Sequence, residues 1–258
     1  MPSSIFRALG FLSRIPVSSA HFPADHQARD DAQFYPLAGS VIAVPATFII
    51  AAAAFVPHAT LLMAAIAIAA LVIITGALHE DGLGDVADGF FATRDKGRIL
   101  DIMRDPHLGT FGMLALVFSV TFRVTALTIL IGQLGALSAA LALMGVEAIS
   151  RAAMVWHWQA LPNARPDGKA DRAGQPDNAQ MWQAVAMGAA IMLICMVAGS
   201  FWAPAVIALL AAAACAFWFK NMCMARIGGH TGDTIGATQQ ITAIAALMTL
   251  AIASNLTN

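Results

Sequence analysis

The sequence has little charge and few of the residues that build a water-soluble surface. Only 11% of its 258 residues are charged and 59% are hydrophobic, with a mean hydropathy of +0.73, whereas a soluble domain carries about 25% charged residues. One water-soluble core cannot hide that much apolar surface, so lipid must cover part of it. The net charge of −1 argues against a nucleic-acid-binding protein, which needs a concentrated positive surface.

Cysteine is also scarce. Cys195 and Cys215 lie in apolar segments and Cys223 in a predicted loop, and their spacing matches neither a zinc site nor a disulfide framework. The first 20 residues contain no sustained apolar segment, because Arg7 and Arg14 interrupt the apolar residues there. We therefore expect no cleavable signal peptide.

Seven apolar segments are long enough, or nearly so, to cross the ~30 Å hydrocarbon layer as helices. They lie at residues 37–56, 60–78, 110–131, 135–155, 183–202, 204–219 and 239–253. We do not expect strands, because an open sheet edge leaves unpaired backbone groups in lipid. The prediction is an all-α fold, a polytopic helical membrane bundle that forms a single domain over residues 1–258.

Charge gathers on one side of this bundle. Of the 14 Lys and Arg residues, 12 fall in the segments on one side of the predicted spans, at residues 1–36, 79–109, 156–182 and 220–238. The connections on the other side contain none, and the remaining two lie inside predicted spans. By the positive-inside rule, the charged side and the N-terminus are cytoplasmic. Residues 5–17 have an apolar face and are expected to form an interfacial helix ended by Pro16. Residues 162–177 are expected to be a mobile excursion without a direct chemical role.

The most informative stretch is 79–110, which reads HEDGLGDVADGFFATRDKGRILDIMRDPHLGT. Its aspartates recur at helical spacing, three on one predicted helix and two on a second short one: Asp81, Asp85, Asp88, Asp101 and Asp105. Like charges at this spacing repel one another, and a divalent cation is the simplest compensation. Clustered oxygen ligands without a nearby cysteine favour Mg²⁺ or Mn²⁺ over zinc.

Basic residues lie among these acids: Arg94, Lys96, Arg98, Arg104 and His107. Carboxylates that hold Mg²⁺ beside basic groups are typical of transfer at a diphosphate. There the metal neutralises bridging oxygens and the basic groups hold the leaving phosphate. The simpler alternative is a solvated loop with alternating charges next to the membrane.

A second polar cluster, GGHTGDTIGATQQ, occupies residues 228–240 on the same side. It offers His230, Thr231 and Asp233 on a flexible backbone, and its simpler alternative is a turn that caps the last helix.

Three charged residues fall inside predicted spans, where an unpaired charge is costly. Glu147 and Arg151 are spaced i, i+4 and could pair, and Arg123 is a further candidate partner of Glu147. Arg151 lies close enough to the cytoplasmic end to reach an anionic substrate.

Five motifs, in order along the chain, resemble those of the cobalamin synthase family. They are FLSRIPV (11–17), FYPLAG (34–39), HEDGLGDVADGFF (79–91), IMRDPHLGTFG (102–112) and GHTGDTIGATQQ (229–240). The resemblance implies a bacterial inner-membrane, Mg²⁺-dependent adenosylcobinamide-GDP ribazoletransferase. Such an enzyme joins adenosylcobinamide-GDP to α-ribazole or its 5′-phosphate and releases GMP, the last assembly step of the nucleotide loop of cobalamin.

A more distant resemblance connects the chain to CDP-alcohol phosphotransferases, which displace CMP from a diphosphate with an alcohol. Asp85-x-x-Asp88-Gly89 followed by Asp101-x-x-x-Asp105 is similar to their signature. The chain departs from that signature because the spacer between the two halves is shorter and its arginine lies one position late.

These observations assign provisional roles. The predicted metal ligands are Asp81, Asp85, Asp88, Asp101 and, as a further ligand, Glu80. By analogy with the CDP-alcohol signature, Asp105 is the predicted general base, with Asp88 also catalytic. The predicted substrate-binding residues are Arg94, Arg98, Arg104, His107, Arg151, His230, Thr231 and Asp233.

Three alternatives remain at this point. A CDP-alcohol phosphotransferase that acts on phospholipid would use the same acids, and a membrane prenyltransferase also uses Asp-rich loops with Mg²⁺. A transporter would place its polar groups near the membrane midplane. The sequence leaves open whether the protein is a homo-oligomer.

Overall fold

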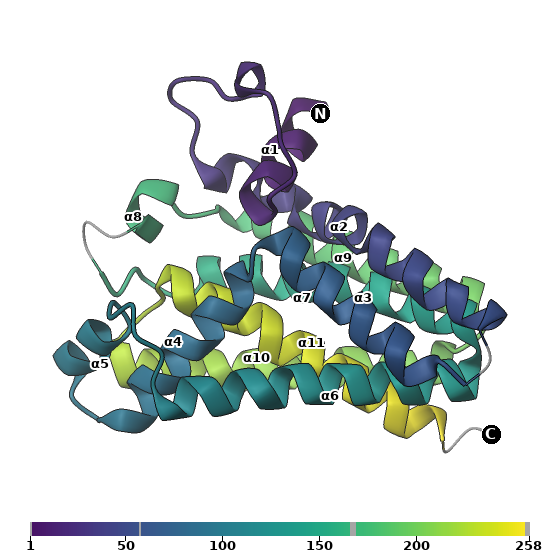
Figure 1. Ribbon diagram of the computed structural model, residues 1–258. Coiled ribbons are helices and arrows are strands. Elements are labelled where there is room, and N and C mark those ends of the chain that lie inside the picture. Colours follow the sequence, from purple (N-terminus) through teal and green to yellow (C-terminus); the bar gives the residue numbers. More distant parts are fainter. Residues whose placement is uncertain (1, 57, 166–168, 256–258) are drawn as a thin grey trace.

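The computed structural model describes residues 2–56, 58–165 and 169–255, and in this part of the chain every regular element is a helix (Figure 1). Among these described residues, six helices are long and apolar enough to cross a membrane. They are α2 (Tyr35–Ala52), α6 (Thr110–Leu134), α7 (Ala136–Ala160), α9 (Asn178–Gly199), α10 (Trp202–Ile227) and α11 (Gly232–Ser254). A seventh exists if α3 (Thr60–Thr75) and α4 (Leu78–Ala92) are counted as one bent span. The predicted polytopic bundle is therefore confirmed.

The second predicted span, 60–78, does not run straight into a surface loop. Helix α3 ends at Gly76, which adopts the left-handed conformation (φ 64°), and Ala77 follows in the same region (φ 59°). A non-glycine residue there costs about 1 kcal/mol. The chain then turns by 90° into α4, which packs against α6 and α11. The Asp-rich segment is thus a helix within the bundle, and hydropathy alone did not indicate it.

The last two predicted spans are too short. Helix α10 continues to Ile227 and α11 begins at Gly232, so the polar stretch predicted as a loop at 220–238 shrinks to residues 228–231. The reason is that α11 buries its polar side chains in the bundle, among them Thr238, Gln239 and Gln240. A hydropathy window treats buried polar residues as if they faced water.

The N-terminal helix α1 (Pro2–Leu12) also ends earlier than the predicted limit at Pro16. It lies on α2 and on the 3₁₀ helix Ala28–Phe34. The buried carboxylate of Asp31 fastens it there, 2.7 Å from Arg7 and 2.7 Å from His26. The apolar side chains of Phe6 and Phe11 remain exposed, as the predicted interfacial position requires.

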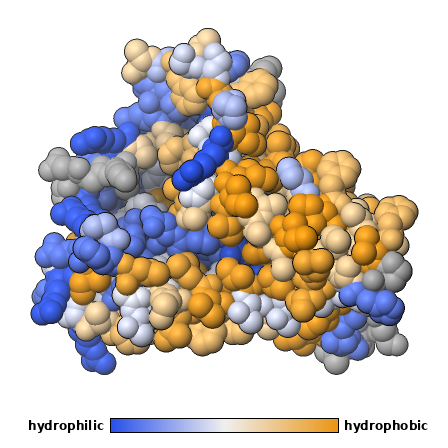
Figure 2. Space-filling model, viewed as in Figure 1, coloured by the Kyte–Doolittle hydropathy of each residue, from blue (hydrophilic) through white to orange (hydrophobic). Residues whose placement is uncertain are grey.

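Two short helices lie at the charged end of the bundle. They are α5 (Lys96–Ile102) and α8 (Lys169–Ala173), both on the left in Figure 1. Figure 2 shows hydrophilic residues gathered over this end and hydrophobic residues over most of the rest of that face. The connections between α6 and α7 and between α9 and α10, at the other end, are only one or two residues long.

A small core joins α4 and α5 to α10. It contains Phe90 of α4, Ile99 of α5, and Phe219 and Cys223 of α10, all of them buried. Most of the remaining apolar core joins α2, α3, α6, α7, α9 and α11. The small core therefore fixes the charged end of the bundle to the spanning helices.

We predict that Gly82→Ala destabilises the protein, because α4 and α11 touch at this glycine. A Cβ atom at Gly82 would lie 2.6 Å from the backbone oxygen of Asp233, and overpacking against backbone costs about 1–3 kcal/mol. The apparent unfolding temperature of the purified protein in detergent should fall. The matched control is Gly132→Ala, where a Cβ atom meets nothing within 4 Å. An unchanged temperature for Gly82→Ala would contradict the described contact.

Candidate active site

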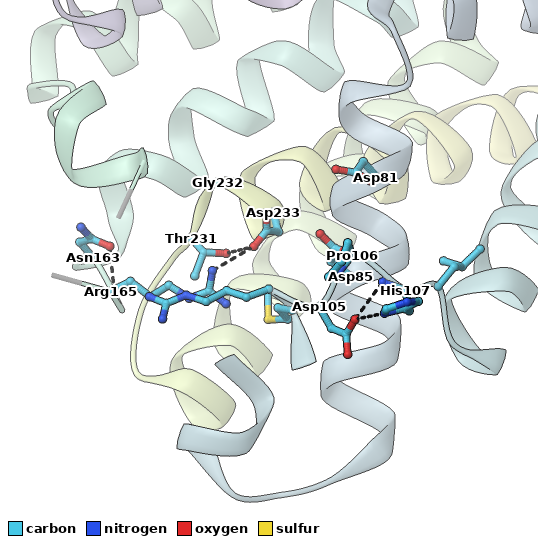
Figure 3. Close-up of a pocket in the computed structure, with 13 residues that line it drawn as sticks. Asp81, Asp85, Asp105, Pro106, His107, Asn163, Arg165, Thr231, Gly232 and Asp233 are labelled. Atoms are coloured by element: carbon cyan, nitrogen blue, oxygen red, sulfur yellow. Dashed lines mark hydrogen bonds and ion pairs between the residues drawn. The ribbon is translucent and has the colours of Figure 1, made fainter. Parts of the chain in front are cut away.

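A cavity of about 650 Å³ opens at the charged end of the bundle. Its wall comes from α4, the connection between α5 and α6, the segment after α7 and the start of α11 (Figure 3). The lining residues are Asp81, Asp85, Met103, Arg104, Asp105, Pro106, His107, Leu108, Asn163, Arg165, Thr231, Gly232 and Asp233.

Four carboxylates face this cavity from three segments that are distant in the sequence. Asp81 and Asp85 are one turn apart on α4, Asp105 lies in the connection before α6, and Asp233 is in the first turn of α11. Asp85 is within electrostatic range of Asp81, Asp88 and Asp233. The cavity therefore concentrates negative charge, which favours a cation or a cation-bound ligand.

Two guanidinium groups oppose these acids. Arg165 approaches Asp233 to 3.6 Å and also donates to the backbone oxygen of Leu100, so it joins α11 to α5. Burial lowers the pKa of Arg165, and the charge of Asp233 opposes that shift. Arg104 is the other arginine of the wall. Guanidinium groups bind phosphate oxygens in pairs of hydrogen bonds.

Arg165 reaches the cavity through a short backbone pairing that the sequence did not indicate. The N–H of His230 donates to the oxygen of Pro162 (2.8 Å), and the N–H of Ala164 donates to the oxygen of His230 (2.9 Å). Gly229 permits this approach, since a Cβ atom there would collide with Pro162. The prediction that 162–177 is an excursion is therefore wrong for residues 162–165, and residues 166–168 lie outside the described part.

The predicted metal ligands separate into two groups. Asp81 and Asp85 line the cavity, whereas Glu80 and Asp101 do not. Glu80 is buried and faces Arg123, and Asp101 is exposed on α5. Because α5 ends at Ile102, the prediction that Asp101 and Asp105 share one helix is wrong.

Asp88 makes contacts of another kind. Its two carboxylate oxygens accept hydrogen bonds from the backbone N–H groups of Gly109 (2.7 Å) and Gly112 (2.8 Å). A Cβ atom at either glycine would overlap the Asp88 carboxylate. Asp88 thus caps the N-terminus of α6 from α4 and holds the connection that carries Asp105.

Four of the predicted substrate-binding residues line the cavity: Arg104, His107, Thr231 and Asp233. Arg94 and Arg98 are exposed at the start of α5 and do not line it. His230 is buried beside the cavity, and burial lowers its pKa to about 4.

The charged residues inside the bundle are paired. Arg151 is buried and bonds to Glu147, which confirms the predicted pair. Arg123 pairs with Glu80 at 3.1 Å and not with Glu147, so the predicted alternative partner is wrong. The reason is that α4, which the sequence placed in a loop, enters the bundle beside α6.

The donor set suits a hard cation. Within residues 2–56, 58–165 and 169–255, no three His, Cys, Asp or Glu side chains lie close enough to form a complete metal-binding group. Mg²⁺ does not need one, because it keeps several waters and is commonly held by one or two carboxylates and by substrate phosphates. Asp81 and Asp85, one turn apart on α4, fit that mode of binding, and Asp233 adds negative charge to the same cavity.

Together, the fold and the cavity define a polytopic membrane protein with an acidic site that suits a phosphate-bearing ligand. The sequence model of the family described as cobalamin-5-phosphate synthase matches residues 4–251. A relative from Allorhizobium ampelinum is 44% identical over 96% of this chain and 95% of its own length. Relatives from Brucella ovis and a Sinorhizobium species are 44% and 42% identical, with the same coverage.

All three relatives are named adenosylcobinamide-GDP ribazoletransferase, and no solved structure matches the chain. The chain belongs to the cobalamin-5-phosphate synthase family. It is therefore a transferase of cobalamin biosynthesis, which confirms the predicted resemblance and removes the transporter alternative.

We predict different effects on stability for two aspartates of α4. Asp88→Ala leaves the amides of Gly109 and Gly112 without their acceptor, which should cost about 1–3 kcal/mol. Asp85→Asn removes one of several mutually repelling charges and should not lower the apparent unfolding temperature measured without Mg²⁺. The assignment of Asp88 as a cap would be wrong if the two variants unfolded at the same temperature.

Proposed function

We propose that this enzyme joins adenosylcobinamide-GDP to α-ribazole or α-ribazole 5′-phosphate and releases GMP in a Mg²⁺-dependent reaction. Family membership and the names of the relatives support the reaction class and the substrates. The assignment of the active site rests on one observation, that four carboxylates and two arginines line the same cavity.

The proposed reaction is a substitution at phosphorus. A ribose hydroxyl of α-ribazole attacks the phosphorus attached to the aminopropanol arm of cobinamide. A new P–O bond forms, the P–O bond to GMP breaks, and the hydroxyl proton passes to a base. Catalysis of such a transfer consists mainly of positioning the reactants and stabilising charge on the phosphoryl oxygens.

The metal would be held by Asp81 and Asp85, which line the cavity from α4, with waters and substrate phosphates as its other ligands; Asp233 faces them from α11. When bound, Mg²⁺ would neutralise the diphosphate oxygens. We leave Asp88, Asp101 and Glu80 out of this ligand set, because none of them lines the cavity.

Asp105 remains the proposed base. Hydrogen bonds from the backbone and side chain of His107 lower the pKa of Asp105, which makes it a weaker proton acceptor than an ordinary aspartate, so the proposal rests on its place in the cavity wall. The Nδ1–H of His107 donates to Asp105 at 2.6 Å, so the Nε2 atom of the neutral ring would be the second acceptor for the proton. Arg104 and Arg165 would hold the phosphates of the substrate and of the departing GMP.

The distribution of charge supports the orientation. The cavity lies at the end where the basic residues gather, and the opposite end has only short connections. By the positive-inside rule we propose a multi-pass protein of the bacterial inner membrane whose cavity opens to the cytoplasm, where nucleotide substrates are available.

The direct test is release of GMP from adenosylcobinamide-GDP by purified protein supplied with α-ribazole. Wild-type protein should release GMP with Mg²⁺ and not with a chelator. Asp81→Asn and Asp85→Asn should each lower kcat by about a thousandfold or more, because each removes a proposed metal ligand. Asp25→Asn, an exposed residue outside the cavity, is the control that should retain activity. Near wild-type turnover of either cavity variant would overturn the site assignment.

We expect Arg165→Gln to weaken binding of adenosylcobinamide-GDP. Loss of a charge-assisted phosphate contact should raise KM by about 10-fold or more. Arg172→Gln, an exposed arginine of α8, is the matched control. An unchanged KM in Arg165→Gln would exclude Arg165 from the substrate site.

A further inference from the structure

A buried ion pair lies directly beneath the proposed metal ligands. Arg123, in the middle of α6, is 2% exposed, and Glu80, in the first turn of α4, is 7% exposed. Their side chains meet at 3.1 Å. An unpaired charge within a membrane bundle costs several kcal/mol, so each of these residues requires the other.

Hydrogen bonds extend this pair to a third helix. The Nε2 of Gln240, on α11, donates to the same Glu80 oxygen that faces Arg123 (3.1 Å). The Oε1 of Gln240 accepts from the hydroxyl of Ser119 (2.8 Å), one turn before Arg123 on α6. The Glu80 carboxylate is therefore the point where α4, α6 and α11 are joined by polar contacts.

The position of Glu80 in the sequence gives this junction a consequence for the site. Glu80 immediately precedes Asp81, and successive residues of a helix point about 100° apart. When Glu80 faces Arg123 in the interior, Asp81 and Asp85 face the cavity. Gln240 lies two turns after Asp233 on α11, so the same junction also sets the position of Asp233 relative to the α4 acids.

The first turn of α4 needs such a fixed point, because Asp88 and Phe90, which also hold this helix, lie near its other end. It follows a 90° bend at two left-handed residues, and several of its positions facing neighbours are glycines, among them Gly82 and Gly84. Glycines allow close approach but supply no side chain that resists rotation of the helix about its axis. A directional bond between charged groups supplies that resistance.

We propose that Glu80 is a positioning residue, which, through its ion pair with Arg123, fixes the rotation of α4 so that Asp81 and Asp85 face Asp233. This inference rests on the proposed function for the identity of the site. It replaces the role of metal ligand that the sequence predicted for Glu80.

A double-mutant cycle tests the proposal in the full-length purified protein. The variants are Glu80→Gln, Arg123→Gln and the double variant, and the control is Thr128→Val, which removes only a bond from a side chain to its own helix backbone on α6. For each variant we would measure kcat and KM for GMP release, the affinity for Mn²⁺ as a spectroscopic substitute for Mg²⁺, and the apparent unfolding temperature.

Each single variant leaves one buried charge without its partner. We expect kcat to fall by about 10- to 100-fold, Mn²⁺ affinity to weaken, and KM for adenosylcobinamide-GDP to stay within about threefold, because Arg104 and Arg165 are unchanged. In the double variant, two amides can bond to each other in place of the ions. Its kcat and Mn²⁺ affinity should recover to within about threefold of wild type.

Two results would overturn the proposal. If Glu80 binds the metal, removing Arg123 cannot restore it, and the double variant would be as inactive as Glu80→Gln. If the pair only stabilises the fold, the single variants would unfold at lower temperature but keep wild-type kcat per folded molecule.

Failure of the proposed function is a separate outcome. It would appear as absence of GMP release by the wild-type protein, whereas the Mn²⁺ affinities would still decide whether Glu80 and Arg123 position the acids.

Discussion

The requirement that charge inside a membrane bundle be paired determines most of this structure. Arg123 with Glu80 and Arg151 with Glu147 satisfy it within the bundle, where an unpaired ion would be strongly unfavourable. Carboxylates that repel one another are tolerated only where water and cations can reach them. The four acids of the cavity accordingly lie at the charged end of the bundle. The need for pairing therefore separates acids that form ion pairs inside the bundle from acids that line the cavity. Glu80 belongs to the first group, and its neighbour Asp81 belongs to the second.

The bend between α3 and α4 makes this division possible. A straight second span would have carried Glu80 and the aspartates into the aqueous connection, away from α11. The two left-handed residues at 76 and 77 instead turn the chain by 90°, which lays α4 against α6 and α11. One face of α4 then meets Arg123 and Gln240, another meets the cavity, and Asp88 near its end caps α6. The free-energy cost of a left-handed alanine is small compared with these contacts.

Much of the fold could be predicted from the sequence, because the length and hydropathy of a spanning helix are local properties. The spans, the charged side and the placing of Asp81, Asp85 and Asp233 on that side followed from spacing and composition. What could not be predicted depends on partners that are distant in the chain. Asp88 has the same helical spacing as its neighbours, but the amides at 109 and 112 decide its role. Arg165 enters the site only because residues 162–164 pair with His230, which no local pattern indicates.

The balance of charge in the cavity connects these contacts to the proposed reaction. Four carboxylates face two guanidinium groups there, so an anionic diphosphate entering alone would meet net repulsion. A divalent cation held by Asp81 and Asp85 would cancel that excess of negative charge and would supply positive charge to the phosphate oxygens. Arg165, now paired with Asp233, would then be free to exchange its carboxylate partner for phosphate as the cation neutralises the acids. In the proposed mechanism a metal would be needed for binding the diphosphate as well as for activating it, and the acid-rich site would discriminate against nucleotides that arrive without a cation.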